Sequence, residues 1–454
     1  MDVLSKEEVG AVQMLSNWSV AAGLIFALLL SLTVDLPAQQ PGPLPGGPDS
    51  QGLTSPRIEP ALVTVGGPDA DVAGFDSRAI QIAIDAVAYR GGGTVRLLPG
   101  RFEIEGPVRL RSNVALVGSG PETVLHKADG FRTRFVIDAD YGMLVVTIED
   151  PAGFRPGLGV QIWDDSALRN CWLVTTAVVT AVDGNRIYLD SPTVLDYQKG
   201  RNGWVSTSVS IIQAVRAENV RVANLVVDGN AGKNDPINGC RGGGIYLHWV
   251  KGATIDSVVV RNFNGDGVSW QTTEDVHLLN SEVYGCTNLG VHPGTGSDRS
   301  VVKNCRIHDN GADGLFLCWR VQNGRFTDNE IWNNGRYGIS IGHKDTDNLF
   351  ENNHIHHNAL HGVFFRNEDE ENAGNRNVFR NNVIEDNGTK EPAFAVYIRG
   401  FTRDLVLENN VLRDTGAGTQ VGGVRIGAHA GDVQMRGNRF EGLKEKVRRE
   451  TEEP

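Results

Sequence analysis

A short repeat of about two dozen residues runs through the second half of the chain. A glycine opens each of five apolar stretches, at intervals of 23, 24, 24 and 24 residues: Gly267, Gly290, Gly314, Gly338 and Gly362. Seven residues before each glycine lies an apolar residue, in a column that begins at Val260 and continues past the last glycine to Phe440. Two columns that keep one period over several units predict a repeat architecture, in which each unit packs mainly on its neighbours.

The residues within each unit predict strands and turns rather than helices. Short alternating apolar stretches are separated by Asn and Gly, and an Asn or Asp precedes each column residue from Val283 onward, such as Asn353 before Ile355. A propeller blade needs about 40 residues, which is longer than these units, and the leucine-rich-repeat consensus is absent. We therefore predict an all-β chain that forms a parallel β-helix. Successive turns lie about 4.8 Å apart, Ile, Val and Leu fill the core, and Asn side chains hydrogen-bond along the axis.

The rest of the chain divides by composition. Residues 1–38 contain an apolar run at 20–34, which is shorter than the roughly 20 residues that span a bilayer and suits a signal peptide. A retained N-terminal membrane anchor is the alternative. Residues 39–57 are rich in Pro and Gly and predict an extended linker, whereas the charged residues 443–454 predict a frayed tail.

Three folded segments are expected between these ends. Within residues 58–125, Asp76 precedes a helical pattern in which Ile80, Ile84 and Val87 share one face, so this segment is predicted to form a cap helix and the first rung. The period is lost over residues 126–217, which we interpret as an inserted β-subdomain. Residues 218–442 are expected to form the parallel β-helix.

Charge and side-chain chemistry exclude some partners. The net charge of −12 disfavours a nucleic-acid partner, because phosphate binding needs a basic surface. The five cysteines form no Cys-x-x-Cys pair and predict neither a disulfide scaffold nor a zinc site. The cluster His354, His356, His357 and His361 is interpreted as a polar edge, so no metal site is predicted. The cofactor stays unknown, with Ca²⁺ as a candidate that helps to neutralise a substrate carboxylate.

Strand alternation predicts where the chemistry lies. In a strand that starts with Gly and places its apolar residues inward, the second and fourth residues after the glycine face outward. With the turn residues that follow, one outer face gathers His248, His292, Trp319, Arg320, His343, Lys344, Arg366, Arg399 and Arg425. Aromatic faces stack on sugar rings and Arg binds carboxylates bidentately, so we interpret this face as a groove for an acidic polysaccharide.

Several stretches carry a family resemblance. DSRAIQIAIDAVAYRGGGTVRLLPGRFEI at 76–104, RSNVALVGSG at 111–120 and NLVVDGN at 224–230 resemble the pectate-lyase-like superfamily of right-handed parallel β-helix proteins. The likeness covers about residues 76–117 and 218–440. It implies the right-handed fold, within a superfamily of polysaccharide lyases, glycoside hydrolases, sugar epimerases, phage tailspikes and proteins without known catalysis.

A local resemblance concerns the candidate site. GVHPGTGSDRS at 290–300, with GLFLCWR at 314–320 one rung later, looks like part of the mannuronan C5-epimerase and alginate-lyase group. There a Tyr-Gly-x-Asp-Pro-His-Asp-type motif is followed one rung on by a strand that ends in Arg, which implies that Arg320 neutralises a carboxylate. His292 precedes Pro293, whereas the family's His follows its Pro. Gly294 occupies that position, and the acidic residue before Pro is missing.

Three functions fit these residues. A uronate lyase or epimerase needs a cation on the carboxylate, from Arg320, Arg366 or Arg399, and a base for the C5 proton, from His292 or Lys344.

An inverting glycosidase needs two carboxylates. Asp266 and Asp313 hold the same register two rungs apart, about 9.6 Å along the axis, and Asp345 with Glu368 is a second pair. The third function is a non-catalytic glycan-binding protein of the cell envelope.

We favour the lyase or epimerase, exported to the cell envelope or beyond, with no membrane contact of its mature domain. The substrate-binding residues are then expected to be His248, Trp319, His343, Asp345, Arg366, Glu368 and Arg399. The oligomeric state is not predicted.

Overall fold

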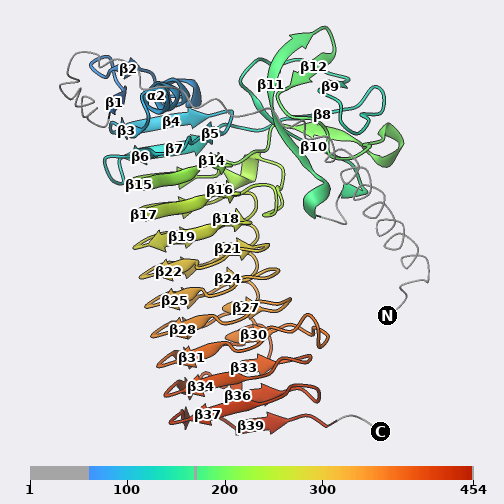
Figure 1. The fold of residues 1–454 in the computed structure, drawn as a ribbon. Coiled ribbons are helices and arrows are strands. Elements are labelled where there is room, and N and C mark those ends of the chain that lie inside the picture. The colour runs from blue at the N-terminus through green and yellow to red at the C-terminus, as the bar shows by residue number, and fades with distance from the viewer. Residues whose placement is uncertain (1–60, 168–170, 452–454) are drawn as a thin grey trace, which may run out of the picture. The chain divides into compact units, whose positions relative to one another are not determined.

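The computed structural model describes residues 61–167 and 171–451 of the chain (Figure 1). The predicted signal peptide or anchor (1–38) and linker (39–57) lie outside the described residues. No helix in the described part is long and apolar enough to cross a membrane.

Two long parallel sheets form a β-helix, whose strands follow one another along the axis from β15 to β39 (Figure 1). In its regular part, each turn of the chain gives two strands to a 22-stranded sheet and one strand to an 11-stranded sheet. The 11-stranded sheet contains β5 (Val108–Arg109), β14 (Ile212–Val215), β16 (Ile245–His248), β18 (Val268–Gln271), β21 (Val291–Gly294), β24 (Leu315–Phe316), β27 (Ile339–Ile341), β30 (Val363–Phe365), β33 (Ala393–Ile398), β36 (Gln420–Ile426) and β39 (Glu445–Arg449). The 22-stranded sheet contains β1 (Ala61–Gly66), β2 (Val72–Ala73), β3 (Gly93–Leu97), β4 (Gly100–Ile104), β6 (Val114–Val117), β7 (Thr123–Lys127), β15 (Glu218–Asp228), β17 (Lys251–Arg261), β19 (Glu274–Leu279), β20 (Glu282–Tyr284), β22 (Val301–Lys303), β23 (Arg306–His308), β25 (Arg325–Thr327), β26 (Glu330–Trp332), β28 (Leu349–Glu351), β29 (His354–His356), β31 (Val378–Arg380), β32 (Val383–Glu385), β34 (Leu405–Glu408), β35 (Val411–Arg413), β37 (Val433–Arg436) and β38 (Arg439–Glu441).

The predicted period is confirmed as strand register. Val291 on β21 pairs with Leu315 on β24, which pairs with Ile339 on β27 and then Val363 on β30. The apolar column also stacks, from Val260 through Ile355 to Phe440, and its members from Val260 to Leu412 are buried. One continuous core therefore runs along the β-helix.

The asparagines form hydrogen-bonded ladders at the bends, as predicted. The Nδ2 of Asn329 donates to Oδ1 of Asn353, which donates in the same way to Asn382, and Asn382 to Asn410, each at 2.9 Å. Each amide also donates to a backbone carbonyl, as Asn353 does to Phe326. These buried side chains thereby satisfy backbone groups at turns that no strand ladder reaches.

A helix covers the N-terminal end of the core, and one further strand extends its C-terminal end. Helix α2 (Ser77–Tyr89) begins at Asp76, whose side chain accepts a hydrogen bond from the backbone N–H of Ala79 at 2.8 Å. Its buried Ile80 and Ile84 belong to the β-helix core. At the other end, the prediction of a frayed tail is wrong for residues 445–449, which form β39 in parallel with β36. The reason is that Val447 pairs with Val424 and packs on the last exposed edge of the core.

An antiparallel sheet interrupts the β-helix, in the order β8–β13–β10–β11–β12–β9. Its strands are β8 (Arg132–Arg134), β9 (Val145–Thr147), β10 (Gly159–Trp163), β11 (Thr175–Asp183), β12 (Arg186–Leu189) and β13 (Trp204–Ser206). It has a core of its own, which includes Phe135, Ile162 and Tyr197. The limits 126 and 217 are too wide, because β7 and β14 on either side pair within the β-helix.

Short 3₁₀ turns complete the described elements at Cys171–Leu173, Lys199–Arg201 and Ala231–Lys233. The last of these begins the loop that leads from β15 to β16, and this loop covers part of the site described next.

Candidate functional site

The outer face of the 11-stranded sheet carries the predicted column of outward residues. Ser269 pairs with His292 across β18 and β21, and Phe316, Ser340 and Phe364 follow in register on β24, β27 and β30. The alternation argument therefore placed these residues on the correct face. It did not indicate which of these outward residues are covered by other segments of the chain.

Asp266 and His292 form a buried pair at the start of this face. His292 Nδ1 lies 2.7 Å from one carboxylate oxygen of Asp266, and the other oxygen accepts hydrogen bonds from Asn288 Nδ2 at 2.7 Å and the backbone N–H of Leu289 at 3.2 Å. The loop before β16 covers the pair, because a Cβ at Gly239 would overlap the Asp266 carboxylate. The carbonyl of Gly239 also accepts a hydrogen bond from the Ser269 hydroxyl at 2.6 Å.

This pairing determines the charge of His292. Burial alone would lower the pKa of the imidazole, but the Asp266 carboxylate, together with the nearby Cys318 thiol, outweighs burial and raises it to about 10. The imidazole therefore keeps its proton at neutral pH. The prediction that His292 is the base for a C5 proton does not fit this arrangement, because a protonated group cannot accept one.

Gln271 Oε1 is a buried polar atom on this face without a hydrogen-bond partner among the described residues, and His292 Nε2 has the Cys318 thiol as its polar neighbour. Gln271 donates to Ser269 at 3.1 Å and lies over Gly294, where a Cβ would overlap its amide. Together with Cys318, which pairs with Gly294, they form a polar cluster across three rungs. Sequence reasoning missed Gln271, although the glycine at its register position on the next rung was a usable signal.

Arg366 is fully engaged by the protein. Its guanidinium donates to Asp345 at 3.1 Å, Ser340 Oγ at 3.1 Å and the carbonyl of Leu317 at 2.8 Å, and lies 4.6 Å from the Phe316 ring centroid. Glu368 adds a carboxylate at 3.7 Å. Arg366 and Glu368 are thus both held near other protein groups, and their contact with a substrate stays a prediction.

Asp345 is fully buried and accepts hydrogen bonds from the backbone N–H groups of Val321 and Gly342. Burial raises its pKa to about 6, against the lowering effect of Arg366. Because Asp345 is enclosed, neither its predicted contact with substrate nor its glycosidase pairing with Glu368 is supported.

The other predicted carboxylate pair is also enclosed. Asp313 is fully buried, and its carboxylate accepts a hydrogen bond from the backbone N–H of Tyr337 at 3.2 Å and lies 3.5 Å from Arg336. Burial raises the pKa of Asp313. With Asp266 bound to His292, neither carboxylate is placed to flank a glycosidic bond, so the inverting pair is not supported.

The predicted basic stripe is largely neutralised by nearby carboxylates. His343 lies 3.4 Å from Glu368, Lys344 lies 3.3 Å from Glu371, and Arg425 pairs with Glu450. His248 is buried, and burial, followed by the nearby Arg241 and Arg216, lowers its pKa to about 4.

Two predicted cations remain without a carboxylate partner among the described residues, Arg320 and Arg399. Arg320 is exposed at a left-handed turn that it shares with Trp319, where the two φ angles are 63° and 67°. Trp319 is 48% exposed and stacks on the His343 ring at a centroid distance of 3.9 Å. The exposed cation and the exposed aromatic residue are therefore consecutive in the turn that follows β24.

The histidine cluster has partners that the sequence did not reveal. Glu330 on β26 comes together with His354 and His356 on β29, with one ligand atom of each within 4.8 Å of the others. His354 also lies 2.7 Å from Glu385 on β32. The cluster therefore has carboxylate partners on the rungs before and after β29. His361 lies apart from them and accepts a hydrogen bond from the backbone N–H of Phe394.

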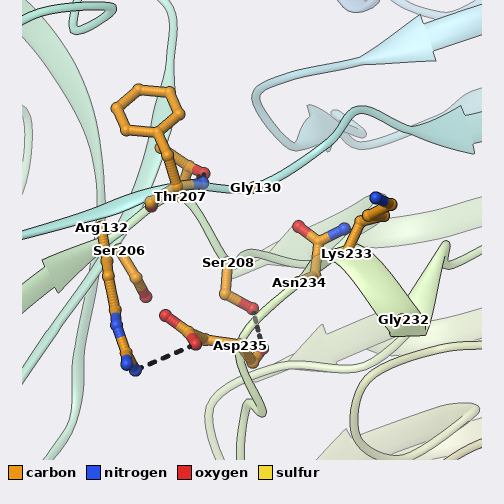
Figure 2. Close-up of a pocket in the computed structure, with 10 residues that line it drawn as sticks. Gly130, Arg132, Ser206, Thr207, Ser208, Gly232, Lys233, Asn234 and Asp235 are labelled. Carbon is orange, nitrogen blue, oxygen red and sulfur yellow. Dashed lines mark hydrogen bonds and ion pairs between the residues drawn. The ribbon is translucent and has the colours of Figure 1, made fainter.

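A polar cavity of about 340 Å³ lies where the inserted sheet leaves the β-helix (Figure 2). Figure 2 shows Arg132 paired with Asp235 at 3.3 Å, and the Ser208 hydroxyl donating to the carbonyl of Asp235 at 2.7 Å. The cation and the carboxylate here neutralise each other. We therefore interpret this cavity as a structural junction.

The sequence matches two protein families. The family described as right handed beta helix region is matched at residues 243–411 and 316–446, and the family described as rhamnogalacturonase A/epimerase, pectate lyase-like at residues 63–315. The second match covers more than half of the chain. The chain belongs to the rhamnogalacturonase A/epimerase, pectate lyase-like family. Membership of this family confirms the right-handed parallel β-helix.

Proteins similar to this chain include mannuronan C5-epimerases of Azotobacter vinelandii. Mannuronan C5-epimerase AlgE3 is 42% identical over 69 residues, a match that covers 13% of this chain and only 4% of that relative. The A-module of AlgE4 aligns with a TM-score of 0.54 at 16% identity, covering 83% of this chain and 96% of that one. The A-module of AlgE6 aligns with the same TM-score at 18% identity, covering 83% and 92%. At these identities, the structural likeness shows the shared fold.

Proposed function

We propose that this family member is a lyase or epimerase that acts on a uronic-acid-containing polysaccharide, on the outer face of its 11-stranded sheet. The observation that carries the proposal is the exposed Arg320 beside Trp319, with no carboxylate partner among the described residues. Nearly every other predicted cation of this face is paired. A protein that leaves one guanidinium free next to an aromatic platform offers a site for a sugar that bears a carboxylate.

Arg320 has the role of neutralising the substrate carboxylate. Elimination and epimerisation of a uronate both begin by removing the proton at C5, and this proton is acidic only when the adjacent carboxylate is neutralised. Arg399 is the second cation without a carboxylate partner among the described residues, and it directly follows the strand β33. It lies three rungs from Arg320, or about 14 Å along the axis, and would bind a neighbouring carboxylate of the same chain.

We assign the C5 proton to Lys344, which accepts it in the fraction of the protein where the amine has given up its own proton. Lys344 takes the position on the next rung that Arg320 takes on its own. The backbone N–H of Arg320 donates a hydrogen bond at 2.9 Å to the carbonyl of His343, the residue before Lys344. Its carboxylate partner Glu371 is 84% exposed, and such a surface pair contributes little and is readily exchanged.

The proton on His292 can take part in the step that follows removal of the C5 proton. A protonated imidazole held by Asp266 can stabilise negative charge on the intermediate, and it can then protonate C5 in an epimerase or the departing glycosidic oxygen in a lyase. Because only 4% of His292 is exposed, this role requires the loop around Gly239 to move when the substrate binds.

Incubation with alginate, pectate and other uronates in D₂O tests the function. Deuterium at C5 without chain cleavage identifies an epimerase, and a rise in absorbance near 235 nm identifies a lyase. Lys344→Gln is expected to abolish exchange while binding persists. New reducing ends with neither signal would identify a hydrolase, and binding without any reaction would identify a glycan-binding protein; either result contradicts the proposal.

We also propose that the protein works outside the cytoplasm, which the apolar run at residues 20–34 supports. Fractionation of cells that produce the full chain tests this, and recovery of the protein only in the cytoplasm would contradict it.

A further inference from the structure

A second cleft lies between the inserted sheet and the first strands of the 11-stranded sheet. It encloses about 590 Å³, which is within the usual range for binding sites of small ligands. One wall comes from β14, β16 and the residues that follow them, and the other from Thr175 and Thr176 of β11 and residues 191–194. Arg320 and Arg399 do not line this cleft, so it is separate from the site described above.

Two guanidinium groups in this cleft have no carboxylate partner among the described residues. Arg216 lies 4.5 Å from the Trp249 ring centroid, and Arg241 donates to the carbonyl of Trp172 at 3.0 Å. The other two arginines of the cleft are paired, Arg109 with Asp190 and Arg111 with Asp85. Neither positive charge is neutralised by a carboxylate of the described residues, so the two charges repel each other and an anionic ligand would relieve that repulsion.

The cleft also offers an aromatic residue. Trp249 is 46% exposed, although it stacks on the ring of His248 at a centroid distance of 3.8 Å. Because His248 and Arg216 cover the ring of Trp249, its exposed part is the ring edge, against which a sugar can pack while its carboxylate accepts hydrogen bonds from the guanidinium groups.

We propose that this cleft is a second binding site for an acidic saccharide, formed by Arg216, Arg241 and Trp249. The ligand class rests on the proposed function. His248 pairs with Gln271 on the next rung, and Gln271 with Gly294, so the cleft and the polar cluster lie on one outer face. From β16 to β24 the distance is three rungs, or about 14 Å, and the loop around Gly239 lies between the two sites. The cleft therefore holds a neighbouring part of the same polysaccharide chain.

Calorimetric titration of the full chain with oligogalacturonate and oligomannuronate tests the inference. The double variant Arg216→Ala/Arg241→Ala is expected to bind at least tenfold more weakly, because each charge-assisted pair contributes about tenfold or more. Arg111→Ala is the matched control, since Arg111 lines the same cleft but is already paired, and its affinity is expected to stay within about twofold of the original. Trp249→Ala is expected to weaken binding without changing the charge.

The outcomes separate this inference from the proposed function. Unchanged affinity in both the double variant and Trp249→Ala overturns the second site, even if C5 exchange is observed. Loss of affinity in the double variant together with no reaction on any uronate overturns only the proposed chemistry. Failure of the original protein to bind either acidic probe overturns the second site as well. Thermal unfolding and circular dichroism of each variant verify that it is folded.

Discussion

Replacing Asp266 by Asn should change the charge of His292 and the stability of the protein. The substitution retains the shape of Asp266 but removes its negative charge. Only the Cys318 thiol then opposes the effect of burial, and the pKa of His292 is expected to fall from about 10 to about the ordinary histidine value of 6.5. A change of that size corresponds to roughly 5 kcal/mol of interaction between the two groups. Leaving one member of a buried pair without its partner typically costs about 3–5 kcal/mol, so we expect a loss of that order at pH 7.

The pH dependence follows from the direction of the shift. In the original protein the pKa of His292 is raised on folding, so the stabilisation is fully present below about pH 6.5 and is lost as the pH rises through 10. The difference in the free energy of unfolding between the original protein and Asp266→Asn should therefore narrow from pH 7 toward pH 10. Urea unfolding at several pH values measures this difference, and histidine NMR follows the titration directly.

Asp309→Asn provides the control. Asp309 lies 2.7 Å from His308, but 51% of its side chain is exposed, so its loss should cost under about 1 kcal/mol. A constant stability difference between pH 7 and 10 for Asp266→Asn would refute the reasoning, as would titration of His292 near 6.5 in the original protein.

Two further predictions concern the β-helix itself. Asn353→Ala removes a ladder amide that serves Asn329, Asn382 and the carbonyl of Phe326, and is expected to lower the free energy of unfolding by about 2–3 kcal/mol in urea titrations. Asn352→Gly on the exposed ladder, which keeps the left-handed backbone at that residue unstrained, should cost under about 1 kcal/mol. Phe350→Ala opens the centre of a stack whose ring centroids lie 4.9 and 4.4 Å from the neighbouring rings, and should cost about 3–5 kcal/mol by the same measurement; a loss below 1 kcal/mol would contradict the packing.

The period made the β-helix predictable. Positions 24 residues apart are neighbours on successive rungs, so the columns that contain Gly290 and Val283 could be assigned to stacked strands from the sequence alone. The prediction of a frayed C-terminal tail failed because it rested only on the high charge of these residues. A single apolar residue, Val447, was enough to bring β39 onto the open end of the core.

The site was less predictable because alternation gives the direction of a side chain but not its surroundings. His292 faces outward from its strand as predicted, yet the loop that contains Gly239 covers it, and no repeat pattern places that loop. Arg366 was correctly placed on the face but extends back over Gly342 to reach Asp345 and the carbonyl of Leu317. Ion pairs between neighbouring turns depend on side-chain reach, which spacing alone does not give.

The inserted sheet shows the same limit. The loss of the period revealed that an insertion exists, but not which rungs it faces. It forms a cleft with β14 and β16 rather than with the strands that carry Arg320 and Arg399.

The affinity of Arg320 variants for an acidic oligosaccharide tests the central claim most directly. Arg325 is an exposed arginine on β25 of the 22-stranded sheet, so Arg325→Ala removes the same charge from a different face. Titration of both variants with the uronate that the original protein binds best should give at least a tenfold rise in Kd for Arg320→Ala and no change for Arg325→Ala. Equal Kd values for the two variants would contradict the account.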